Sequence, residues 1–590
     1  MGAFFLFTKH SNIDLPSTRQ VFRDRGFNEP NVFDLNGATL WLFRKQLLED
    51  NNYYFLNATT AIFAVGTPVY RGTTYLETLR GVLKDYVAGI LDWNQLLGAF
   101  CLILFVNGRL HIINDRLHLQ HVFYDEGGTR ISSSFLAIIQ STKERLRLSR
   151  RAVYEKLMTG YVTGSETMIE GIHRWTSDEA PYREFGSNIR LLTVETGPSG
   201  YEPSSPGGFT ECATHQVHTL RQYFAQIRAN AQRYGCDIGL SGGYDSRLIY
   251  ALACSLRLPV TAHTHATGHA HASEVQIAEE LAQLHGVKLR IIPTRDILSQ
   301  PEEALDSVLE ENFNYFDGRC ADNSGFFGET YTRWYRLAVQ GSCKLGLNGL
   351  GGEIYRNYYC TPNRVRFPHW FTANVLYPGA QFVLNKRASR NEVIAAVLEK
   401  MGKRLDAKLT GKVDLLTVRR YYSEIRQPDC EGAVVNAHNQ LSLYLTPFIE
   451  YQIIREAYSA TPHLGPSGQF QSAMLELIDS DAARVSSHYG YPLIHQPASR
   501  LLIASVKRIV PDLFWILRRR SQVRHSATLT KDYERYQSLV ARSRTLGEIH
   551  DTLQTFVPGI ALPLCLRHSG QRRTTLFVGY FLKRFAERIS

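Results

Sequence analysis

Short apolar stretches separated by turn residues fill the first third of the chain, from about residue 3 to residue 195. Residues 98–106 are almost continuously apolar and are followed by Asn107-Gly108, a pair that favours a tight β-hairpin. This pattern predicts a strand-rich domain over residues 1–200. The stretch 197–208, rich in glycine, proline and serine, is the predicted linker to the rest of the chain.

Beyond residue 210 the pattern changes to helix-like segments that separate a few apolar strands. The predicted strands are a run that ends at Leu240 and two more at residues 259–264 and 344–348. An alternation of strands and helices predicts a parallel sheet, which binds its ligands at the carboxyl ends of its strands. Residues after about 380 are predicted to be mostly helical. The sequence therefore predicts an α/β fold with a second domain over residues 210–590.

Length and composition agree with a soluble protein of two domains. The chain has 590 residues, more than one hydrophobic core usually supports. Its 44% hydrophobic and 21% charged residues are typical of soluble globular proteins. The net charge of +11 is spread along the chain, with local clusters such as residues 518–520. It favours a triphosphate or an acidic peptide over nucleic acid as a partner.

The cysteines and the apolar runs bear on the compartment. Nine cysteines without a Cys-x-x-Cys pair indicate free thiols in a reducing environment. No apolar run approaches the roughly 20 residues of a membrane span, and the first residues lack the basic region of a signal peptide. We therefore expect a cytoplasmic protein.

Residues 236–250 combine a short apolar strand, a serine-glycine turn and the start of a helix. The turn is Ser241-Gly242-Gly243-Tyr244-Asp245-Ser246. Two glycines let the backbone approach an anion, and the N–H groups at a helix N-terminus point toward negative charge. Asp245 would repel a bare phosphate, so we interpret it as a ligand of a magnesium ion that bridges the protein to pyrophosphate. The order differs from the Walker motif, which ends in Gly-Lys-Ser/Thr.

This turn resembles the pyrophosphate loop of asparagine synthetase B and its relatives, enzymes that split ATP between its α and β phosphates. The resemblance implies ATP and Mg²⁺ as cofactors and a C-terminal ATP-pyrophosphatase domain with a parallel sheet and a helical lobe. It also implies that Thr264 opens the loop after the second strand, where relatives hold the adenine. The nucleotide-binding residues that it predicts are Leu240, Ser241, Gly242, Gly243, Asp245, Ser246, Thr264 and Gly349.

A second glycine turn, residues 347–353, resembles the Ser-Gly-Glu-Gly-Ser-Asp motif of the same family. The match implies that Glu353 is the second magnesium carboxylate, paired with Asp245. Leu350 stands at the family's first glutamate, which is a tyrosine in β-lactam synthetase and helps to deprotonate the attacking amine there. Because leucine cannot act as a base, we expect another group to take that proton. Candidates by proximity in sequence are Glu329, Tyr331 and Tyr355.

The resemblance extends to the first domain. Residues 98–100, 114–124 and 132–134 are similar to segments of the glutaminase domain of asparagine synthetase. This implies an αββα fold of the amino-terminal-nucleophile hydrolase type. In the family, a cysteine after the initiator methionine attacks glutamine, but Gly2 stands at that position here. We therefore expect the domain to make no ammonia from glutamine and to serve as a scaffold or docking surface.

Relatives also keep a lysine near the C-terminus that stabilises the charge building up on the acyl-adenylate. Arg519 and Lys531 are the candidates for this catalytic cation. The alternative is that both belong to a solvated basic helix face. Residues 447–450 are similar to the family's Pro-Phe-Leu-Asp, which packs the helical lobe.

A cluster of histidines invites a different interpretation. Four of them within nine residues are a possible zinc site, although the segment coincides with the predicted nucleotide loop. They are His263, His265, His269 and His271.

Taken together, these features predict an ATP-dependent amide ligase that forms AMP and pyrophosphate. Without the glutaminase cysteine, the amine must be free ammonia or belong to a substrate. Relatives that lack this cysteine include β-lactam synthetases and lasso-peptide cyclases. Our preferred hypothesis is a lasso-peptide macrolactam synthetase, which joins an Asp or Glu side chain of a precursor peptide to that peptide's N-terminal amine in antibiotic biosynthesis.

The expected partners are the precursor peptide and the leader peptidase of the same pathway. The alternatives are a β-lactam synthetase-like or other amide ligase of small molecules and, from a different class, a non-catalytic scaffold.

Overall fold

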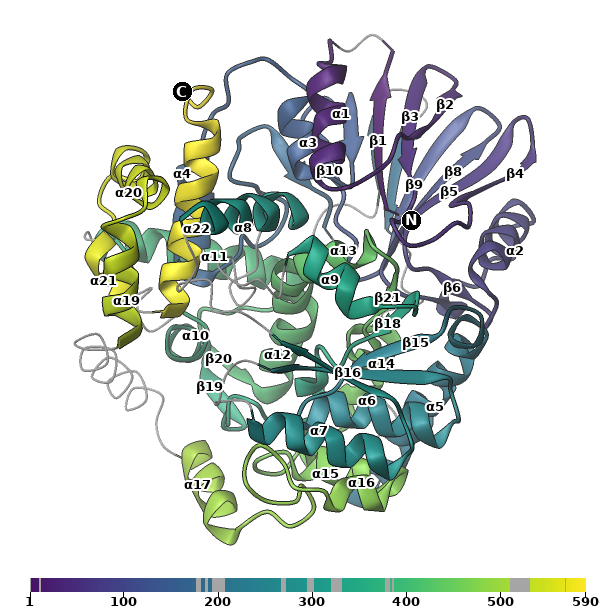
Figure 1. Ribbon diagram of the computed structural model, residues 1–590, viewed down its shortest axis with the longest axis vertical. Coiled ribbons are helices and arrows are strands. Elements are labelled where there is room, and N and C mark those ends of the chain that lie inside the picture. Colours follow the sequence, from purple (N-terminus) through teal and green to yellow (C-terminus); the bar gives the residue numbers. More distant parts are fainter. Residues whose placement is uncertain are drawn as a thin grey trace.

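The computed structural model describes most of the chain (Figure 1). The described residues are 2–9, 12–176, 182–185, 189–193, 207–266, 272–293, 302–319, 332–376, 383–384, 387–509, 531–567 and 569–590. The predicted linker therefore lies almost entirely outside them.

Among the described residues, the strand-rich first part forms two sheets of six strands each and a small sheet of β6 (Val69–Tyr70) and β7 (Leu96–Leu97). The first sheet has the order β12-β10-β11-β1-β3-β2, with β1 Ala3–Thr8, β2 Asn31–Leu35, β3 Ala38–Phe43, β10 Phe123–Asp125, β11 Arg130–Ser132 and β12 Ile172–Arg174. The second has the order β13-β14-β9-β8-β5-β4, with β4 Tyr53–Asn57, β5 Thr60–Gly66, β8 Phe100–Val106, β9 Arg109–Asn114, β13 Tyr182–Phe185 and β14 Ile189–Thr193. Neighbouring strands run antiparallel except β9 and β14, which are parallel.

Alternating side chains on these strands build three layers of core. Phe4 on β1 and Phe63 on β5 are fully buried between the two sheets. Phe5 faces the other way, toward helices α1 (Leu15–Asp24) and α3 (Phe135–Gln140). On the second sheet, Ile62 faces helix α2 (Tyr75–Val87). The resulting order is helix, sheet, sheet, helix, because each sheet has two apolar faces to cover.

The hairpin predicted at Asn107-Gly108 is confirmed. These two residues connect β8 to β9 with φ angles of 50° and 78°. Both angles lie in the left-handed region that a two-residue hairpin of this type requires, which asparagine and glycine adopt most readily.

The second part of the chain contains the predicted parallel sheet. Five strands of the described residues have the order β17-β16-β15-β18-β21, and all neighbours are parallel. Their bounds are β15 Cys236–Gly239, β16 Val260–Ala266, β17 Leu289–Pro293, β18 Leu345–Leu347 and β21 Leu443–Leu445. Numbered along the chain the order is 3-2-1-4-5, so it reverses between β15 and β18. In open α/β sheets such a reversal opens a crevice at the carboxyl ends of the strands, where ligands bind.

The second strand is longer than predicted. β16 continues to Ala266 because its pairing with β17 persists through Pro293. Thr264 pairs with Ile291 and is buried. It therefore lies inside the strand and not in the loop that follows, which corrects the expected place of this residue.

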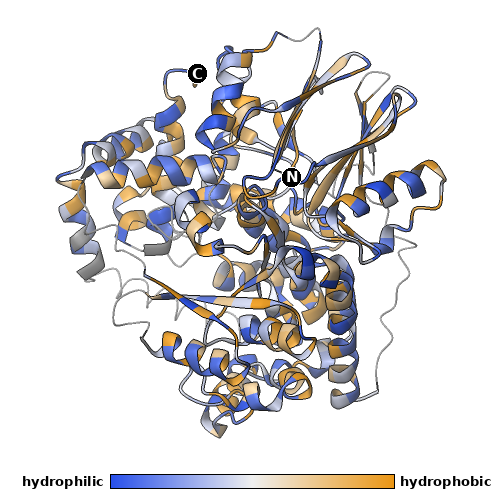
Figure 2. Ribbon diagram, turned by 45° about the vertical axis from the view of Figure 1, so that its right-hand side comes forward, coloured by the Kyte–Doolittle hydropathy of each residue, from blue (hydrophilic) through white to orange (hydrophobic). Residues whose placement is uncertain are grey.

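Helices flank the parallel sheet. In Figure 2 their hydrophobic residues are orange and their hydrophilic residues are blue, and both colours alternate along each helix. One of these helices is α7 (Ala272–Leu284). Helices α5 Phe209–Tyr234 and α6 Tyr244–Ser255 also share the core of this sheet. Helices α8 Glu302–Tyr315 and α9 Arg333–Gln340 follow along the chain, and their apolar residues pack in the core that covers the first sheet.

The chain after residue 380 is mostly helical, as predicted. One element in it was not foreseen: residues Tyr421–Glu431 form a π-helix, a rare element that often marks a functional site. The short strands β19 (Arg364–Arg366) and β20 (Lys412–Asp414) pair beside it. The helices around and after it are α10 Phe367–Asn374, α11 Arg387–Leu405, α12 Leu415–Arg420, α13 Gly432–Asn439, α14 Tyr451–Tyr458, α15 Gln469–Ile478, α16 Ser480–Arg484, α17 Ala498–Ile509, α19 Lys531–Val540, α20 Arg544–Phe556, α21 Leu562–Arg567 and α22 Ser569–Phe585.

The last helices return to the first part of the chain (Figure 1). The rings of Phe135 and Phe581 stack with their centroids 6.0 Å apart. At the C-terminus, the Ser590 N–H donates to the carbonyl oxygen of Leu146 over 2.9 Å. The two ends of the sequence therefore share one core.

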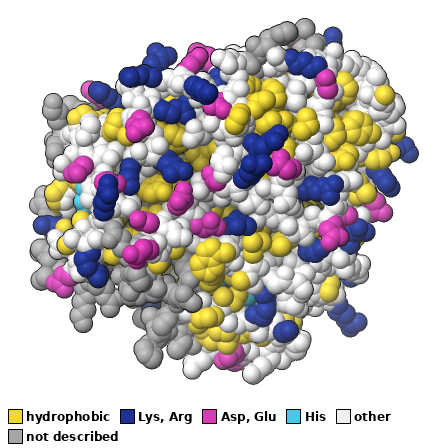
Figure 3. Space-filling view, turned by 45° about the horizontal axis from the view of Figure 1, so that its top comes forward, with side chains coloured by type: hydrophobic (Ala, Val, Ile, Leu, Met, Phe, Trp, Pro, Cys, Tyr) yellow, Lys and Arg dark blue, Asp and Glu magenta, His cyan; other side chains and the backbone are white. Residues whose placement is uncertain are grey.

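The surface and the cysteines match the compositional picture. Lys and Arg are interspersed with Asp and Glu over the face seen in Figure 3. Every cysteine that the structure describes is a free thiol. Among the described helices, none combines the length and apolarity that crossing a membrane requires.

Candidate functional site

The serine-glycine turn lies between β15 and α6, at the point where the strand order reverses. Helix α6 begins after Gly243, and none of the described side chains caps its N-terminus. Its first N–H groups are therefore left to a ligand or to solvent, and the helix dipole favours an anion there.

The two serines hold the turn in shape. The hydroxyl oxygens of Ser241 and Ser246 are 2.8 Å apart, and the Ser241 N–H donates to the Ser246 hydroxyl over 3.1 Å. Ser241 is exposed, whereas Leu240 before it is buried and links to β16 through a backbone bond to His263. Strand β15 thus anchors the start of the turn, while Ser241 faces solvent.

A segment from the helical part covers the glycines of the turn. The fully buried Arg247 donates to the carbonyl oxygens of Val485 and Ser486 over 2.7 and 2.8 Å. This fixes the backbone that continues to His488, whose N–H donates to the Gly242 carbonyl over 3.3 Å. Arg247 therefore has a positioning role, because its side chain points away from the open side of the turn.

Two glycines after β18 allow the second loop to approach α6. A Cβ on Gly349 would lie 2.7 Å from the carbonyl carbon of Asp245 and 2.8 Å from the Ser246 nitrogen. A Cβ on Gly352 would lie 2.2 Å from a carboxylate oxygen of Asp245. A Cβ on Gly349 would force the backbone apart, and one on Gly352 would displace the Asp245 side chain, so these glycines set the distance between the ends of the two neighbouring strands.

Asp245 and Glu353 face each other across this gap and share one cation. One guanidinium nitrogen of Arg356, Nη2, is 2.9 Å from Asp245 Oδ2 and 3.0 Å from Glu353 Oε1. The side chains of the two acids retain 23% and 22% exposure, so solvent reaches them. We call these two residues the acidic pair.

Two further side chains orient the acidic pair. The Tyr422 hydroxyl, on the π-helix, donates to Glu353 Oε2 over 2.6 Å. The Gln471 amide, on α15, donates to Asp245 Oδ1 over 2.7 Å. Each carboxylate therefore has one oxygen on a neutral donor and the other on Arg356. A cavity of about 20 Å³ lies beside Glu353 and Arg356.

The electrostatics of the acidic pair are unbalanced, because two carboxylates face one guanidinium. Burial raises the pKa of Asp245 above its ordinary value, although Arg356 opposes the shift. Burial would also raise the pKa of Glu353, but Arg356 and the Tyr422 hydroxyl outweigh it and the pKa lies below its ordinary value. A second cation between the two acids would relieve the repulsion.

Several predicted residues lie elsewhere or outside the described residues. Tyr355, a candidate base, is fully buried against Phe448 and does not reach the acidic pair in any described contact. Burial raises its pKa far above the ordinary value, so it is unsuited to be a base. Outside the described residues lie Glu329, Tyr331 and Arg519. Lys531 is the first residue of α19, and its side chain is not described.

The histidines that suggested zinc have other partners. His263 Nδ1 lies 2.7 Å from a carboxylate oxygen of Asp237, and His265 Nδ1 lies 2.9 Å from the Tyr335 hydroxyl. His269 and His271 lie outside the described residues. No group of three or more potential metal ligands was found among the described His, Cys, Asp and Glu residues.

Three residues that contact the acidic pair were not predicted from the sequence. Arg356 follows Glu353 by three positions in a 3₁₀ turn, a spacing at which side chains meet, so its role was detectable. Tyr422 and Gln471 come from elements far along the chain and left no local signal.

The chain was compared with protein-family models, with curated protein sequences and with solved structures. No protein-family model matches the chain, and no curated protein matches its sequence. Among solved structures, the chain is similar to glutamine-dependent NAD⁺ synthetase from Acinetobacter baumannii in complex with ADP, with 17% identity and a TM-score of 0.15. The match covers 37% of this chain and 46% of that one, so it spans less than half of that protein. A likeness at this TM-score carries no argument about function, and the functional assignment rests on the chain's own residues.

Proposed function

We propose that this protein is an ATP-dependent amide ligase that activates a carboxylate by adenylation and releases pyrophosphate. The observation that carries the proposal is the acidic pair. Asp245 and Glu353 lie at the carboxyl ends of neighbouring parallel strands, at the reversal of strand order, and both are within 3.0 Å of one cationic nitrogen. This is the crevice in which open α/β sheets bind nucleotides.

The residues present fit a magnesium ion and a triphosphate. Two carboxylates that converge on one point form a donor set that Mg²⁺ accepts, with phosphate oxygens and water as the remaining ligands. The uncapped N-terminus of α6 and the hydroxyls of Ser241 and Ser246 fit phosphate oxygens. When bound, Mg²⁺ would neutralise charge on the departing pyrophosphate. Arg356 would then turn from the carboxylates to a phosphate, which a guanidinium also binds well.

The first part of the chain supports an amine that comes from outside a glutaminase reaction. A Cβ at Gly2 would lie 2.3 Å from the Phe27 ring and 2.5 Å from the Arg44 carbonyl oxygen. A cysteine at this position would therefore clash with backbone. The proposed amine is free ammonia or a group of the substrate itself.

Within this class we propose intramolecular ligation of a peptide, in the manner of a lasso-peptide macrolactam synthetase. An Asp or Glu side chain would be adenylated and then attacked by the N-terminal amine of the same peptide. This proposal is supported by the turns at 241–246 and 347–353, which resemble those of the asparagine synthetase B family. It is also supported by Gly2, where the family's nucleophilic cysteine would clash. A precursor peptide and a leader peptidase are the proposed partners. The Arg519 and Lys531 assignments remain predictions from the sequence.

The experiment presents the full chain with Mg-ATP and a peptide that has a free N-terminal amine and an internal Asp or Glu. The expected result is pyrophosphate release together with a product lighter than the peptide by one water. Asp245→Asn should reduce both by at least about 100-fold, because the metal loses a carboxylate. The matched control is Asp481→Asn, since Asp481 is an exposed acid paired with Arg484.

The outcomes separate the alternatives. Pyrophosphate release with small amines and acids but not with peptides would favour a ligase of small molecules. Binding of a peptide without ATP turnover would favour the scaffold. Full activity of Asp245→Asn would remove the basis of the proposal.

A further inference from the structure

A second polar site lies between the first part of the chain and the helical part. It is a cavity of about 70 Å³ that shares no lining residue with the cavity beside the acidic pair. His121 and Arg174 line it from the first part, Arg319 from the segment after α8, and Asp429 from the π-helix. A buried water needs roughly 10–15 Å³ on this scale, so the cavity can hold several waters or a small organic molecule.

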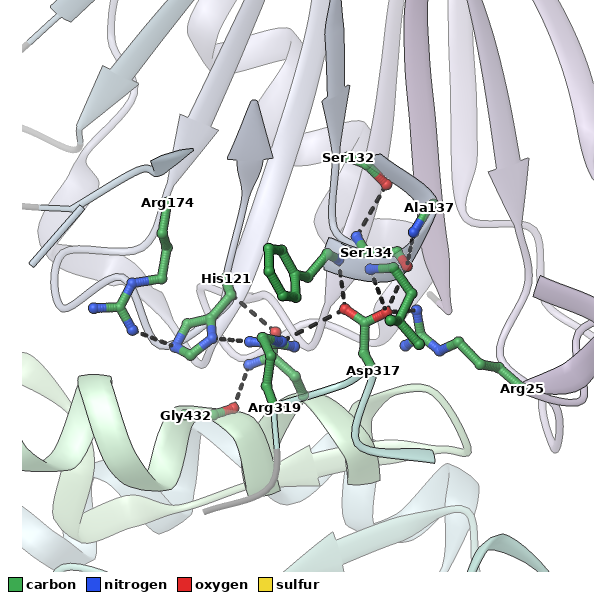
Figure 4. Close-up of polar contacts among 12 residues, drawn as sticks. Arg25, His121, Ser132, Ser134, Ala137, Arg174, Asp317, Arg319 and Gly432 are labelled. Carbon is green, nitrogen blue, oxygen red and sulfur yellow. Dashed lines mark hydrogen bonds and ion pairs between the residues drawn. The ribbon is translucent and has the colours of Figure 1, made fainter. Parts of the chain in front are cut away.

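His121 is a neutral acceptor between two arginines (Figure 4). Its Nε2 lies 2.9 Å from the Pro428 carbonyl oxygen, which can only accept, so Nε2 carries the proton. Its Nδ1 then accepts from Arg319 Nη1. Burial, followed by the charges of Arg319 and Arg174, holds the pKa of His121 well below its ordinary value.

This arrangement leaves Arg174 with donors that lack an acceptor. Its Nη2 is satisfied by the Gly164 carbonyl oxygen at 2.8 Å and by Asp429 Oδ1 at 2.6 Å. Its Nη1 lies 3.5 Å from His121 Nε2, which is itself a donor. Its Nε has no partner among the described residues. Arg174 is only 6% exposed, so water outside the cavity does not compensate.

Two ion-pair clusters beside the cavity hold more arginines than acids, and the lining itself adds one cation, Lys156, and one acid, Glu166. The carboxylate of Asp429 is shared by Arg174 and by Arg404, the latter at 2.8 Å. That of Asp317 is shared in the same way by Arg25 at 3.0 Å and Arg319 at 3.5 Å. Four arginines thus meet two acids. Each acid is therefore shared by two arginines, and a negatively charged ligand beside Arg174 and Arg319 would stabilise this cluster further.

The remaining walls are apolar. Phe123, Phe135 and Met168 line the cavity, and the Arg319 guanidinium lies over the Phe123 ring with its carbon 4.8 Å from the centroid. These walls suit a hydrocarbon body better than a hydrated inorganic ion.

We propose that this cavity binds a small organic carboxylate, whose oxygens accept from Arg174 and Arg319 and whose apolar body packs against Phe123, Phe135 and Met168. The site is separate from the ligase reaction proposed above.

The test is a calorimetric titration of the full chain with benzoate, with benzamide as its uncharged counterpart. Saturable binding of benzoate without binding of benzamide is expected. Arg174→Gln should weaken benzoate binding at least about 10-fold, because a charged donor is lost. Equal binding of the acid and the amide, or undiminished binding by Arg174→Gln, would overturn the proposal.

A second variant guards against misfolding of Arg174→Gln. Glu166 also lines the cavity, is partly exposed and pairs with Arg151 and Lys400. Glu166→Gln removes a negative charge and should tighten benzoate binding about 3-fold, whereas unchanged or weaker binding would contradict the proposal.

Two controls test the chemical class of the ligand and the position of its binding site. Inorganic phosphate should bind much more weakly than benzoate, and equal binding would show that the carboxylate assignment is wrong. Asp245→Asn should bind benzoate like the unmodified protein, since the acidic pair shares no lining residue with the cavity. A loss of benzoate binding in that variant would contradict a separate site.

Discussion

The acidic pair and the arginine-lined cavity contain the same kinds of side chain in opposite proportions. At the acidic pair two carboxylates share one guanidinium. At the cavity each of two carboxylates, Asp317 and Asp429, is shared by two arginines. The first cluster lacks positive charge and the second lacks negative charge. The ligand that a polar cluster suits therefore follows from its charge balance, and not from the residue types alone.

Burial separates the two sites further. The acids of the acidic pair keep more than a fifth of their side-chain surface exposed, whereas those of Asp317 and Asp429 are 1% exposed. The π-helix Tyr421–Glu431 reaches both, since it carries Tyr422 at one end and Asp429 near the other. An accessible acidic pair suits a ligand that exchanges readily with solvent, while the buried cluster suits one that exchanges more slowly.

The largest expected effect comes from Gly349→Ala. Its Cβ would meet the backbone of Asp245 and Ser246 at 2.7–2.9 Å, which pushes the two strand ends apart. Affinity for Mg-ATP should fall about 100-fold, because phosphate contacts need the close approach of these loops. Calorimetry with Mg-ATP measures the loss.

The same variant also separates the two sites, because its benzoate binding should not change. Gly547→Ala is the matched control. Gly547 lies in α20 with nothing within 4 Å of its Cβ position, so alanine should leave ATP affinity intact and stabilise the helix slightly. Unaltered ATP affinity in Gly349→Ala would mean that this loop does not touch the nucleotide.

An intermediate effect is expected from Arg356→Met. Removing the guanidinium leaves the acidic pair without a cation, so Mg²⁺ alone should stabilise the variant more than it stabilises the unmodified protein. A rise of about 2–5 °C in the thermal midpoint on adding Mg²⁺, beyond that of the unmodified protein, is expected.

Arg484→Met, at an exposed arginine paired with Asp481, serves as the control for this measurement. If Mg²⁺ shifts all three proteins equally, Arg356 and the metal do not compete for the same carboxylates.

The smallest effect concerns Glu450, a buried acid whose described hydrogen-bond donors are neutral. Its carboxylate accepts from the Gly98 N–H at 3.1 Å and from the Tyr223 hydroxyl at 3.3 Å. Burial raises its pKa to about 7. The folded protein therefore binds a proton that the unfolded chain releases between about pH 4.5 and 7, and stability falls as the pH rises through this window.

Glu450→Gln removes this pH-dependent loss of stability. The thermal midpoint of the variant minus that of the unmodified protein should therefore be about 2 °C higher at pH 8 than at pH 5. Parallel pH profiles of the two proteins would show that Glu450 does not titrate in this range. Unlike the acids of the two sites, Glu450 pairs with no arginine in the described contacts, so burial sets the direction of its pKa shift.

Local signals in the sequence predicted several elements in both parts of the chain. Apolar runs and turn residues, which act within a few positions, predicted the strand, turn and helix at residues 236–250 and the strand at 344–348, both at the proposed ATP site. They also predicted the hairpin at Asn107-Gly108 in the first part. The parallel sheet followed from the alternation of these elements. The domain boundaries stay predictions.

Contacts between distant segments could not be predicted in the same way. Tyr422 and Gln471 reach the acidic pair from elements whose own sequences indicate only helices. Thr264 was placed in a loop because the pattern gave no sign that β17 would extend the pairing of β16. Within residues 421–431, Pro428 signals an irregular helix, because proline cannot donate the i→i−4 hydrogen bond, but it does not specify a π-helix.

The role of the acidic pair is tested by calorimetric titration of the full chain with ATP in the presence and absence of Mg²⁺. The account predicts saturable binding that requires Mg²⁺ and that weakens at least about 100-fold in both Asp245→Asn and Glu353→Gln. Absence of binding, or binding that both variants retain, would contradict the assignment of the acidic pair to a nucleotide-bound cation.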